Sequence, residues 1–288
     1  MTEGKIGIIG GSGLYEMEEL SEIREERVDT PFGEPSDAYI LGKMLGKELV
    51  FLPRHGRGHR ILPSELNFRA NIYGMKKLGV DTLLSVSAVG SMKEAIEPGH
   101  IVIPDQFFDM TKNRISTFLG NGVVGHAGFG DPICPSLKEA LYHASVDSGA
   151  TTHKNGTYVC IEGPLFSSRA ESLVYRSWGV DVIGMTNATE AKLAREAEIC
   201  YSTIALSTDY DCWHEEEEDV TADAVLAIIH KNVAMAKKIL KKSIETIGAA
   251  RECTCRNAME HAIVTSPELI PEKTKKDLDL IIGRYIKE

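Results

Sequence analysis

Two aspartates stand two residues apart at the point where an apolar run ends. Asp209 and Asp211 follow the run Ile204–Leu206. No histidine or further carboxylate joins them in the sequence at a metal-ligand spacing, which disfavours a metal site. A carboxylic acid that is partly buried beside a second carboxylate keeps its proton closer to neutral pH. The pair can therefore donate a proton to one atom and accept a hydrogen bond from another, and an ordinary acidic loop is the alternative.

A second group of candidate residues directly follows another apolar run. Arg54 and His55 come together there, beside Gly56 and Gly58, which let a ligand approach the backbone closely. The planar fork of an arginine matches a phosphate in a way that lysine does not. The glycines interrupt any helical face that would align His55 with His59, which argues against a metal site. The stretch indicates an anion site, with a solvated basic loop as the alternative.

Two serines complete the set of residues suited to an oxyanion. Ser12 lies in the turn Gly10–Gly13, whose N–H groups and hydroxyl can cradle one phosphate, although a structural glycine turn explains the pattern equally well. The dinucleotide fingerprint fails there, because its third glycine would fall at Glu16. Ser87 lies among small residues but lacks the G-x-S-x-G elbow, so a serine hydrolase gains no support.

These candidates all lie where predicted strands end. Apolar runs followed by turn residues predict strands at 5–11, 48–53, 81–90, 100–105, 157–163, 180–186 and 199–207. Helical spacing predicts helices at 63–80, 136–150, 167–179 and 188–198, a longer one beginning near Thr221, and a last one from Pro271 to Lys287. The alternation predicts an α/β fold, with one domain over 1–288 and a central mixed, twisted β-sheet flanked by helices. Ligands bind beyond the carboxyl ends of strands in such sheets.

Charge and composition limit the classes of partner that the protein can bind. The 288 residues carry a formal net charge of −10, which disfavours nucleic acid and anionic membranes as partners. No run approaches 18 apolar residues and the first residues lead directly into a strand, so we expect a cytoplasmic protein without a membrane segment. The six cysteines are scattered, and Cys253 and Cys255 lack the spacing of a zinc motif. We therefore expect reduced thiols and no metal site.

Eight segments occur in the order found in one known family. They read IGIIGGSGLY, DTPFGEPSDAYILGK, RHGRGHRILPSELNFRANIY, SAVGSM, PGHIVIPDQFFDMT, IEGPLFSSRAES, VIGMTNATEAKLARE and STDYDCWHEEEEDV. From about residue 5 to 245 the chain resembles the superfamily of trimeric purine nucleoside phosphorylases and methylthioadenosine phosphorylases. The resemblance implies a homotrimer or homohexamer with shared active sites. It also implies no cofactor, with inorganic phosphate as a co-substrate.

The C-terminal part, 250–288, is a charged tail that ends in the last predicted helix. Its stretch CTCRNAMEHAIV resembles members of the family from thermophilic archaea and bacteria, some of which carry disulfides. Whether Cys253 and Cys255, or Cys134 and Cys200, are bonded to each other is left open by the sequence.

The resemblance assigns roles to individual residues. It implies that phosphate is held by Ser12, Arg54, His55, Ser87, the Ala88 amide and Thr186. It implies that the nucleoside contacts Phe166, Ser167, Met185, Asp209, Asp211 and Val225, and that His126 reaches the site of a neighbouring subunit. Asp209 would face the purine N7 as a general acid, and Asp211 would accept a hydrogen bond from the 6-amino group. Asp209 together with Ser167 is the combination associated with 6-aminopurines.

The implied reaction is phosphorolysis of S-methyl-5'-thioadenosine to adenine and 5-methylthioribose 1-phosphate. The alternatives are a purine nucleoside phosphorylase that acts mainly on adenosine or also on inosine and guanosine, and a nucleoside-binding protein without activity. Two features depart from the family pattern near the sugar: TNATE at 186–190, where TVPE is commoner, and Gly184, where an asparagine is frequent. The acidic run 214–219 reads as a solvated loop, with a mobile gate over the base as the alternative.

Overall fold

The computed structural model describes residues 4–214, 222–248 and 252–286. Eleven strands and six α-helices alternate along these residues. The strands are β1 (Lys5–Gly10), β2 (Ser21–Glu26), β3 (Tyr39–Met44), β4 (Lys47–Pro53), β5 (Val80–Ser91), β6 (Ile101–Ile103), β7 (Gln106–Asp109), β8 (Thr152–Lys154), β9 (Thr157–Cys160), β10 (Val182–Gly184) and β11 (Cys200–Asp209). The helices are α1 (Phe68–Lys77), α2 (Pro135–Asp147), α3 (Arg169–Ser177), α4 (Asn187–Glu196), α5 (Ala222–Thr246) and α6 (Glu272–Ile282).

All the strands belong to one mixed sheet. Its order is β2-β3-β4-β1-β5-β10-β9-β7, and β11 pairs with β5 and β6. The neighbours β4, β1, β5 and β11 run parallel to one another, so their carboxyl ends meet at one edge. The strand β10 runs antiparallel to β5 but parallel to β9. The expectation of an α/β fold with a central mixed sheet flanked by helices is confirmed.

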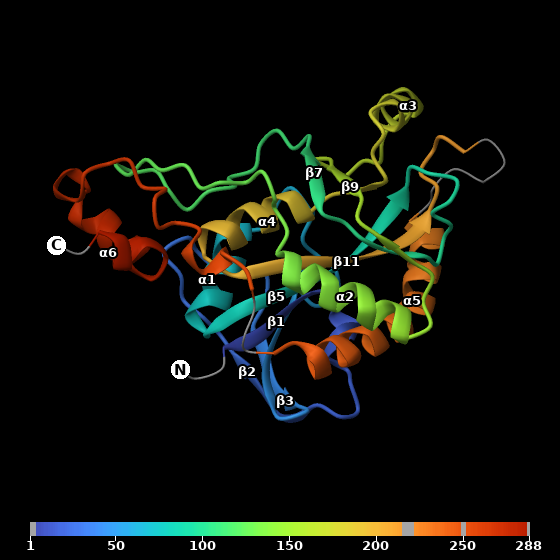
Figure 1. Cartoon of the computed structure of the whole chain (residues 1–288), viewed down its shortest axis with the longest axis horizontal. Coiled ribbons are helices and arrows are strands. Elements are labelled where there is room, and N and C mark those ends of the chain that lie inside the picture. The colour runs from blue at the N-terminus through green and yellow to red at the C-terminus, as the bar shows by residue number, and fades with distance from the viewer. Residues whose placement is uncertain (1–3, 215–221, 249–251, 287–288) are drawn as a thin grey trace.

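Helices cover both faces of this sheet. On one face α2 and α5 pack with strand residues such as Ile8 and Leu84, and on the other α1 and α4 pack with Ile9 and Leu83. Neighbouring strand residues thus point to opposite faces, as the pleat requires, and both sets are buried. Burial on both faces is the reason that β5 and β11 read as nearly continuous apolar runs. Figure 1 shows the helices on either side of the central strands.

The predicted elements are present, with shifted ends. The helix predicted at 63–80 begins at Phe68, because the side chain of Asn67 caps it by accepting a hydrogen bond from the Ala70 N–H. The sequence reading missed β2, β3, β7 and β8. Most of β2 is exposed, so it has no alternation of apolar and polar residues to reveal it. The predicted helix start at Thr221 lies outside the described residues. Among the described helices, none is long and apolar enough to cross a membrane.

Residues 252–286, which we call the C-terminal arm, share the core of the sheet domain. Met259, Ile270 and Ile281 are buried in the same apolar cluster as α1 and α4. The backbone of the arm also pairs with the loop before α2, through the bridge between Gly125 and Ile263. Figure 1 shows this loop and α6 side by side.

Candidate active site

The predicted strand exits converge in space. The backbone N–H of Arg54 donates to the Gly10 carbonyl at 2.8 Å, so the residues after β4 lie beside the turn after β1. Ser85 is the register partner of Ile9 in β1 and of Thr203 in β11. The ends of β1, β4, β5 and β11 therefore form a single rim, as expected for a ligand site in a parallel sheet.

Arg54 is buried in this rim, and its guanidinium fork is closed by Glu190. Nε of Arg54 pairs with one carboxylate oxygen of Glu190, and Nη2 lies 3.1 Å from the other. Ser85 Oγ and the Val86 carbonyl accept further hydrogen bonds from the guanidinium at 2.6 and 3.0 Å. Most of the guanidinium fork is therefore occupied within the protein, and the role of Arg54 in phosphate binding stays a prediction. A buried guanidinium needs a carboxylate partner, and these contacts leave one N–H of Nη1 to point at an anion.

The beginning of α4 belongs to the same network. The Asn187 amide nitrogen is 2.9 Å from Ser85 Oγ and 2.8 Å from both Tyr201 Oη and Thr203 Oγ1. Thr186, which is the N-cap residue of α4, is buried next to it. A helix N-terminus carries partial positive charge and suits an anion. The segment TNATE, which departs from the family pattern, thus supplies the partners that lock this helix end in place.

His55 lies half-buried beside Arg54. Its Nδ1 is 2.8 Å from the Ile61 carbonyl, so this nitrogen carries the hydrogen and Nε2 has a free lone pair. Burial, reinforced by the positive charge of Arg54, lowers the pKa of His55 to about 4. His55 is therefore neutral at pH 7. It stacks on His59 with ring centroids 4.4 Å apart, which is a ring contact and not a metal-ligand arrangement.

Ser87 and Ala88 face the rim from β5. Ser87 is buried, and Ala88 is half-buried. The hydroxyl of Tyr158 is buried nearby and makes no hydrogen bond of ordinary geometry with the described residues. A Cβ at Gly184 would lie 2.0 Å from this hydroxyl, so Tyr158 fills the space that a side chain at position 184 would need. Sequence reasoning missed Tyr158, because a tyrosine within a strand reads as core.

Asp209 and Asp211 lie together at the end of β11. Asp209 Oδ2 accepts from the Thr208 hydroxyl at 2.6 Å, and its Oδ1 accepts from the Asp211 N–H at 2.8 Å. Asp211 is buried, and its Oδ2 accepts from the Ser172 hydroxyl. Burial raises the pKa of both carboxyls, and the charge of Asp209 adds to the rise for Asp211. The direction is the one that the sequence reading required for a proton donor.

A loop before α3 brings further predicted residues to this pair. The thiol of Cys212, next to Asp211, lies 3.3 Å from the Ser167 carbonyl. Ser167 Oγ is buried and has no hydrogen-bond partner among the described residues. The Ser168 side chain caps α3, and Ser172 on that helix holds Asp211. The loop is thus anchored at both ends, with one buried hydroxyl left to meet a ligand.

Met185 and Phe166 lie at the margins of this rim. Arg114 holds Met185 in place through its backbone carbonyl and also binds Glu162, with 3.1 Å between Nε and Oε1. Phe166 is 47% exposed, so in a single chain its ring is largely uncovered. Sequence reasoning missed Arg114 and Glu190, because neither follows a glycine turn or a strand end.

His126 is not part of this constellation within one chain. It is exposed, and its N–H donates to the Ala262 carbonyl of the C-terminal arm at 2.8 Å. Figure 1 shows that segment beside α6, on the side of the molecule opposite the end of β11. The side chains of Ser12 and Val225, and residues 215–219 of the acidic run, lie outside what the structure describes.

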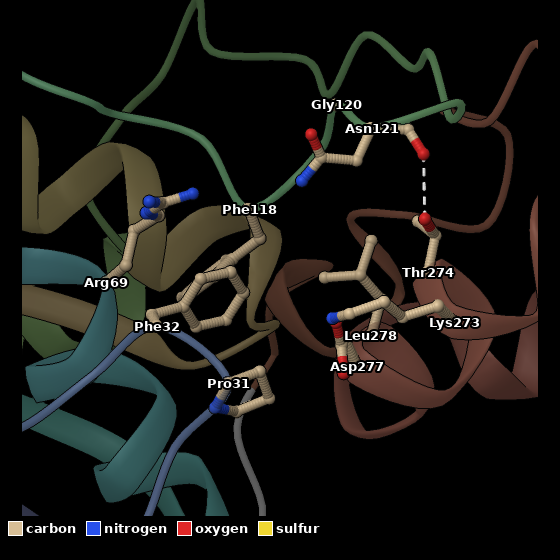
Figure 2. Close-up of a pocket in the computed structure, with 10 residues that line it drawn as sticks. All are labelled: Pro31, Phe32, Arg69, Phe118, Gly120, Asn121, Lys273, Thr274, Asp277 and Leu278. Atoms are coloured by element: carbon tan, nitrogen blue, oxygen red, sulfur yellow. Dashed lines mark hydrogen bonds and ion pairs between the residues drawn. The ribbon is translucent and has the colours of Figure 1, made fainter.

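One small surface pocket lies away from the rim. Its volume is about 140 Å³, below the range of about 300–1,000 Å³ typical of drug-sized ligand sites. Figure 2 shows the C-terminal arm forming one wall, where Thr274 donates to the Asn121 carbonyl at 2.7 Å. Phe32 and Phe118 form the opposite wall. The pocket is a seam between the arm and the core and not a nucleoside site.

The six cysteines are distributed unevenly in space. Cys160 and Cys212 stand apart, but the sulfur atoms of Cys134, Cys200, Cys253 and Cys255 all lie within 4.8 Å of one another. No metal-ligand spacing is visible in the sequence, because the four cysteines come from three distant parts of the chain.

The fold is that of a nucleoside phosphorylase, and comparison with known proteins agrees. The model of the phosphorylase superfamily matches residues 5–245, and the chain belongs to that family. It is 61% identical to the S-methyl-5'-thioadenosine phosphorylase of Geobacter sulfurreducens over 99% of this chain and 100% of the relative. It is 47% identical to the enzyme of that name from Thermofilum pendens, over 92% of this chain and 100% of the relative.

Solved structures give the same result. A methylthioadenosine phosphorylase from an antarctic soil metagenomic library superposes with a TM-score of 0.93 at 47% identity, covering 98% of this chain and 99% of the other. The methylthioadenosine phosphorylase of Schistosoma mansoni in complex with adenine superposes with a TM-score of 0.83 at 34% identity, covering 97% and 98%.

Proposed function

We propose that this protein cleaves S-methyl-5'-thioadenosine with phosphate, giving adenine and 5-methylthioribose 1-phosphate. The observation that carries the proposal is the pair of half-buried Asp209 and buried Asp211, whose raised pKa values suit a proton donor beside an acceptor. The relatives and solved structures named above, which carry the name of this activity, support the same substrate. Inorganic phosphate is a co-substrate of the reaction.

Phosphate would bind between Arg54, His55, Ser87 and the beginning of α4. One N–H of the guanidinium, the Ser87 hydroxyl and the N-terminus of α4 offer donors to its oxygens. The Nδ1 hydrogen of His55 is engaged by the Ile61 carbonyl, so Nε2 accepts a hydrogen bond from the P–OH group of HPO₄²⁻. Neutral His55 thus orients phosphate with an unprotonated oxygen toward C1' of the sugar.

The bond-making step needs an acid on the opposite side of the sugar. A phosphate oxygen attacks C1' as the C1'–N9 bond breaks, and the bonding electrons pass into the purine. The protonated carboxyl of Asp209 gives its proton to N7, so neutral adenine leaves. General acid catalysis of this kind contributes about 10²–10⁴-fold, or roughly 3–5 kcal/mol. Asp211, with Oδ1 as the remaining acceptor, binds the 6-amino group and disfavours a 6-oxo group.

Substrate choice is tested by a comparison of kcat/KM for methylthioadenosine, adenosine and inosine, each with and without phosphate. We expect methylthioadenosine to be the best substrate, inosine the poorest, and no release of base without phosphate. Equal or higher kcat/KM for adenosine would instead assign the protein to the adenosine-preferring phosphorylases. Base binding with no phosphate-dependent release would leave a binding protein without activity.

The protein is also proposed to act as a homo-oligomer, a trimer or hexamer. Support comes from exposed apolar side chains at and before α3: Leu165, Phe166, Leu173, Val174 and Trp178. A second copy of the chain, bringing its His126 segment, would cover Phe166 and complete the nucleoside pocket. Sedimentation velocity on the wild type and on Leu173→Asp tests this. We expect a trimer or larger for the first and a smaller, less active species for the second, and a wild-type monomer with full activity would refute it.

A further inference from the structure

Four cysteines from three distant parts of the chain meet at one point. Cys134 precedes α2, Cys200 begins β11, and Cys253 and Cys255 lie at the start of the C-terminal arm. Their four sulfur atoms all lie within 4.8 Å of one another, and those of Cys200 and Cys253 are 3.5 Å apart. The convergence is mutual, since every sulfur is near all three others.

Such a set matches the geometry of a single tetrahedral metal ion. A zinc–sulfur bond of about 2.3 Å places the thiolates of a tetrahedral site about 3.8 Å from one another. Two disulfides would require only that the sulfurs approach in pairs. We propose that Cys134, Cys200, Cys253 and Cys255 bind one structural Zn²⁺ ion per chain, at a site separate from the active-site rim.

The surroundings of the four sulfurs suit a closed structural site. Cys134 and Cys200 are 1% exposed and Cys255 is 7% exposed, and all three belong to the apolar cluster beneath α2 and α5. Soft thiolates in a dry pocket select zinc over the hard ions Mg²⁺ and Ca²⁺. Cys134 is the N-cap residue of α2, so its sulfur lies at the positive end of a 13-residue helix. That field stabilises a thiolate.

Zinc binding would deprotonate the four thiols of this cluster. Binding replaces four S–H bonds with four Zn–S bonds and releases four protons, so the affinity for zinc falls as the pH is lowered.

The site would fasten the C-terminal arm to the sheet. Only Cys253 and Cys255 come from the arm, and the other two ligands lie at the start of α2 and in β11, which belong to the core. From this point the arm runs on to pair with the loop that carries His126 and to form the seam shown in Figure 2. Zinc would thereby stabilise the position of the loop that carries His126.

The test uses the full-length protein, purified anaerobically with reductant and without chelator. Mass spectrometry of metals should find about one zinc per chain in the wild type and nearly none in Cys253→Ser or Cys255→Ser. Cys160→Ser, which changes a buried cysteine outside the cluster, is the matched control and should keep about one zinc ion per chain. Replacing zinc by Co²⁺ should give the visible absorption of a tetrahedral tetrathiolate site in the wild type and in the control variant alone.

Alkylation under denaturing conditions separates the competing states. In the zinc protein all six cysteines should become alkylated once a chelator is added, without reductant. Protection of two or four thiols until reductant is added would show disulfides and overturn the proposal. Six free thiols with no bound metal would overturn it equally, as would an undiminished zinc content in Cys253→Ser.

Discussion

Glu190 and Arg54 form a buried ion pair in which the side chains are 0% and 4% exposed. Both carboxylate oxygens of Glu190 accept hydrogen bonds from the guanidinium of Arg54, and 136 positions separate the two residues along the chain. A lone charge at this depth would carry a large desolvation cost, so each residue depends on the other. The pair links the end of β4 to the first turn of α4, and so it positions both His55 and Thr186.

Glu190→Gln should therefore destabilise the protein strongly. The change leaves a buried guanidinium without a counter-charge, which costs about 3–5 kcal/mol. Urea unfolding measures the loss. The control is Glu25→Gln, which removes the carboxylate from an exposed pair with Arg57 and should cost less than about 1 kcal/mol. Similar losses in the two variants would mean that the buried pair has no special role.

Asp209→Asn should lower kcat for methylthioadenosine by about 10²–10⁴-fold, because an amide cannot give up a proton to N7. The exposed residue Asp131 offers a control, since Asp131→Asn makes the same substitution at an exposed position. Steady-state kinetics at saturating phosphate measure kcat for methylthioadenosine in the wild type and in both variants. Unchanged kcat in Asp209→Asn would remove this carboxyl from the mechanism.

The pH dependence should follow the same carboxyl. Burial raises the pKa of Asp209, so the folded protein holds this proton more tightly than the unfolded chain does. The contribution of Asp209 to folding stability is fully present below its pKa in the unfolded chain. It is lost as the pH rises through its pKa in the folded protein. The rate of phosphorolysis should also fall as the pH rises through the folded-state pKa, because Asp209 loses the proton that it donates. A pH–rate profile should show this limb in the wild type, and its persistence in Asp209→Asn would assign it to another group.

His55 should show the opposite sign. Burial and Arg54 lower its pKa from 6.5 to about 4, so the folded state binds this proton less tightly than the unfolded chain. Its contribution to stability is complete above pH 6.5 and is lost as the pH falls toward 4. Between pH 7 and pH 5 the loss is about 2 kcal/mol. His55→Gln should remove this part of the acid sensitivity, whereas His261→Gln, at an exposed position, should leave it intact.

The contact between Gly184 and Tyr158 makes a further prediction. Gly184→Ala would bring a Cβ to 2.0 Å from the Tyr158 hydroxyl, and overpacking of this kind costs about 1–3 kcal/mol. Tyr158→Leu should relieve the clash, so the double variant should lose less stability than the two single changes added together. Gly130→Ala, where no atom lies within 4 Å of the new Cβ, is the control. Strict additivity in thermal unfolding would rule out the contact.

Much of this architecture could be predicted from local patterns. Seven apolar runs and the glycine and polar residues after them located the central strands, because burial on both faces of a sheet leaves that mark in the sequence. The same rule predicts from the sequence alone that Arg54, Ser87 and Asp209 lie at one edge of the sheet. The exposed strand β2 escaped detection, because a solvated edge strand has no such pattern.

What the sequence determined by itself was the family, the strand ends and the residue types at the rim. Only the tertiary structure decided that Glu190 closes the fork of Arg54, that Tyr158 fills the space over Gly184, and that four cysteines meet beside α2. These relationships join parts of the chain that lie 26 to 136 positions apart, with only Cys253 and Cys255 near each other in sequence, whereas local patterns report only the nearest turns of the chain. The burial that raises the pKa of Asp209 and lowers that of His55 likewise exists only once the sheet and its helices have packed.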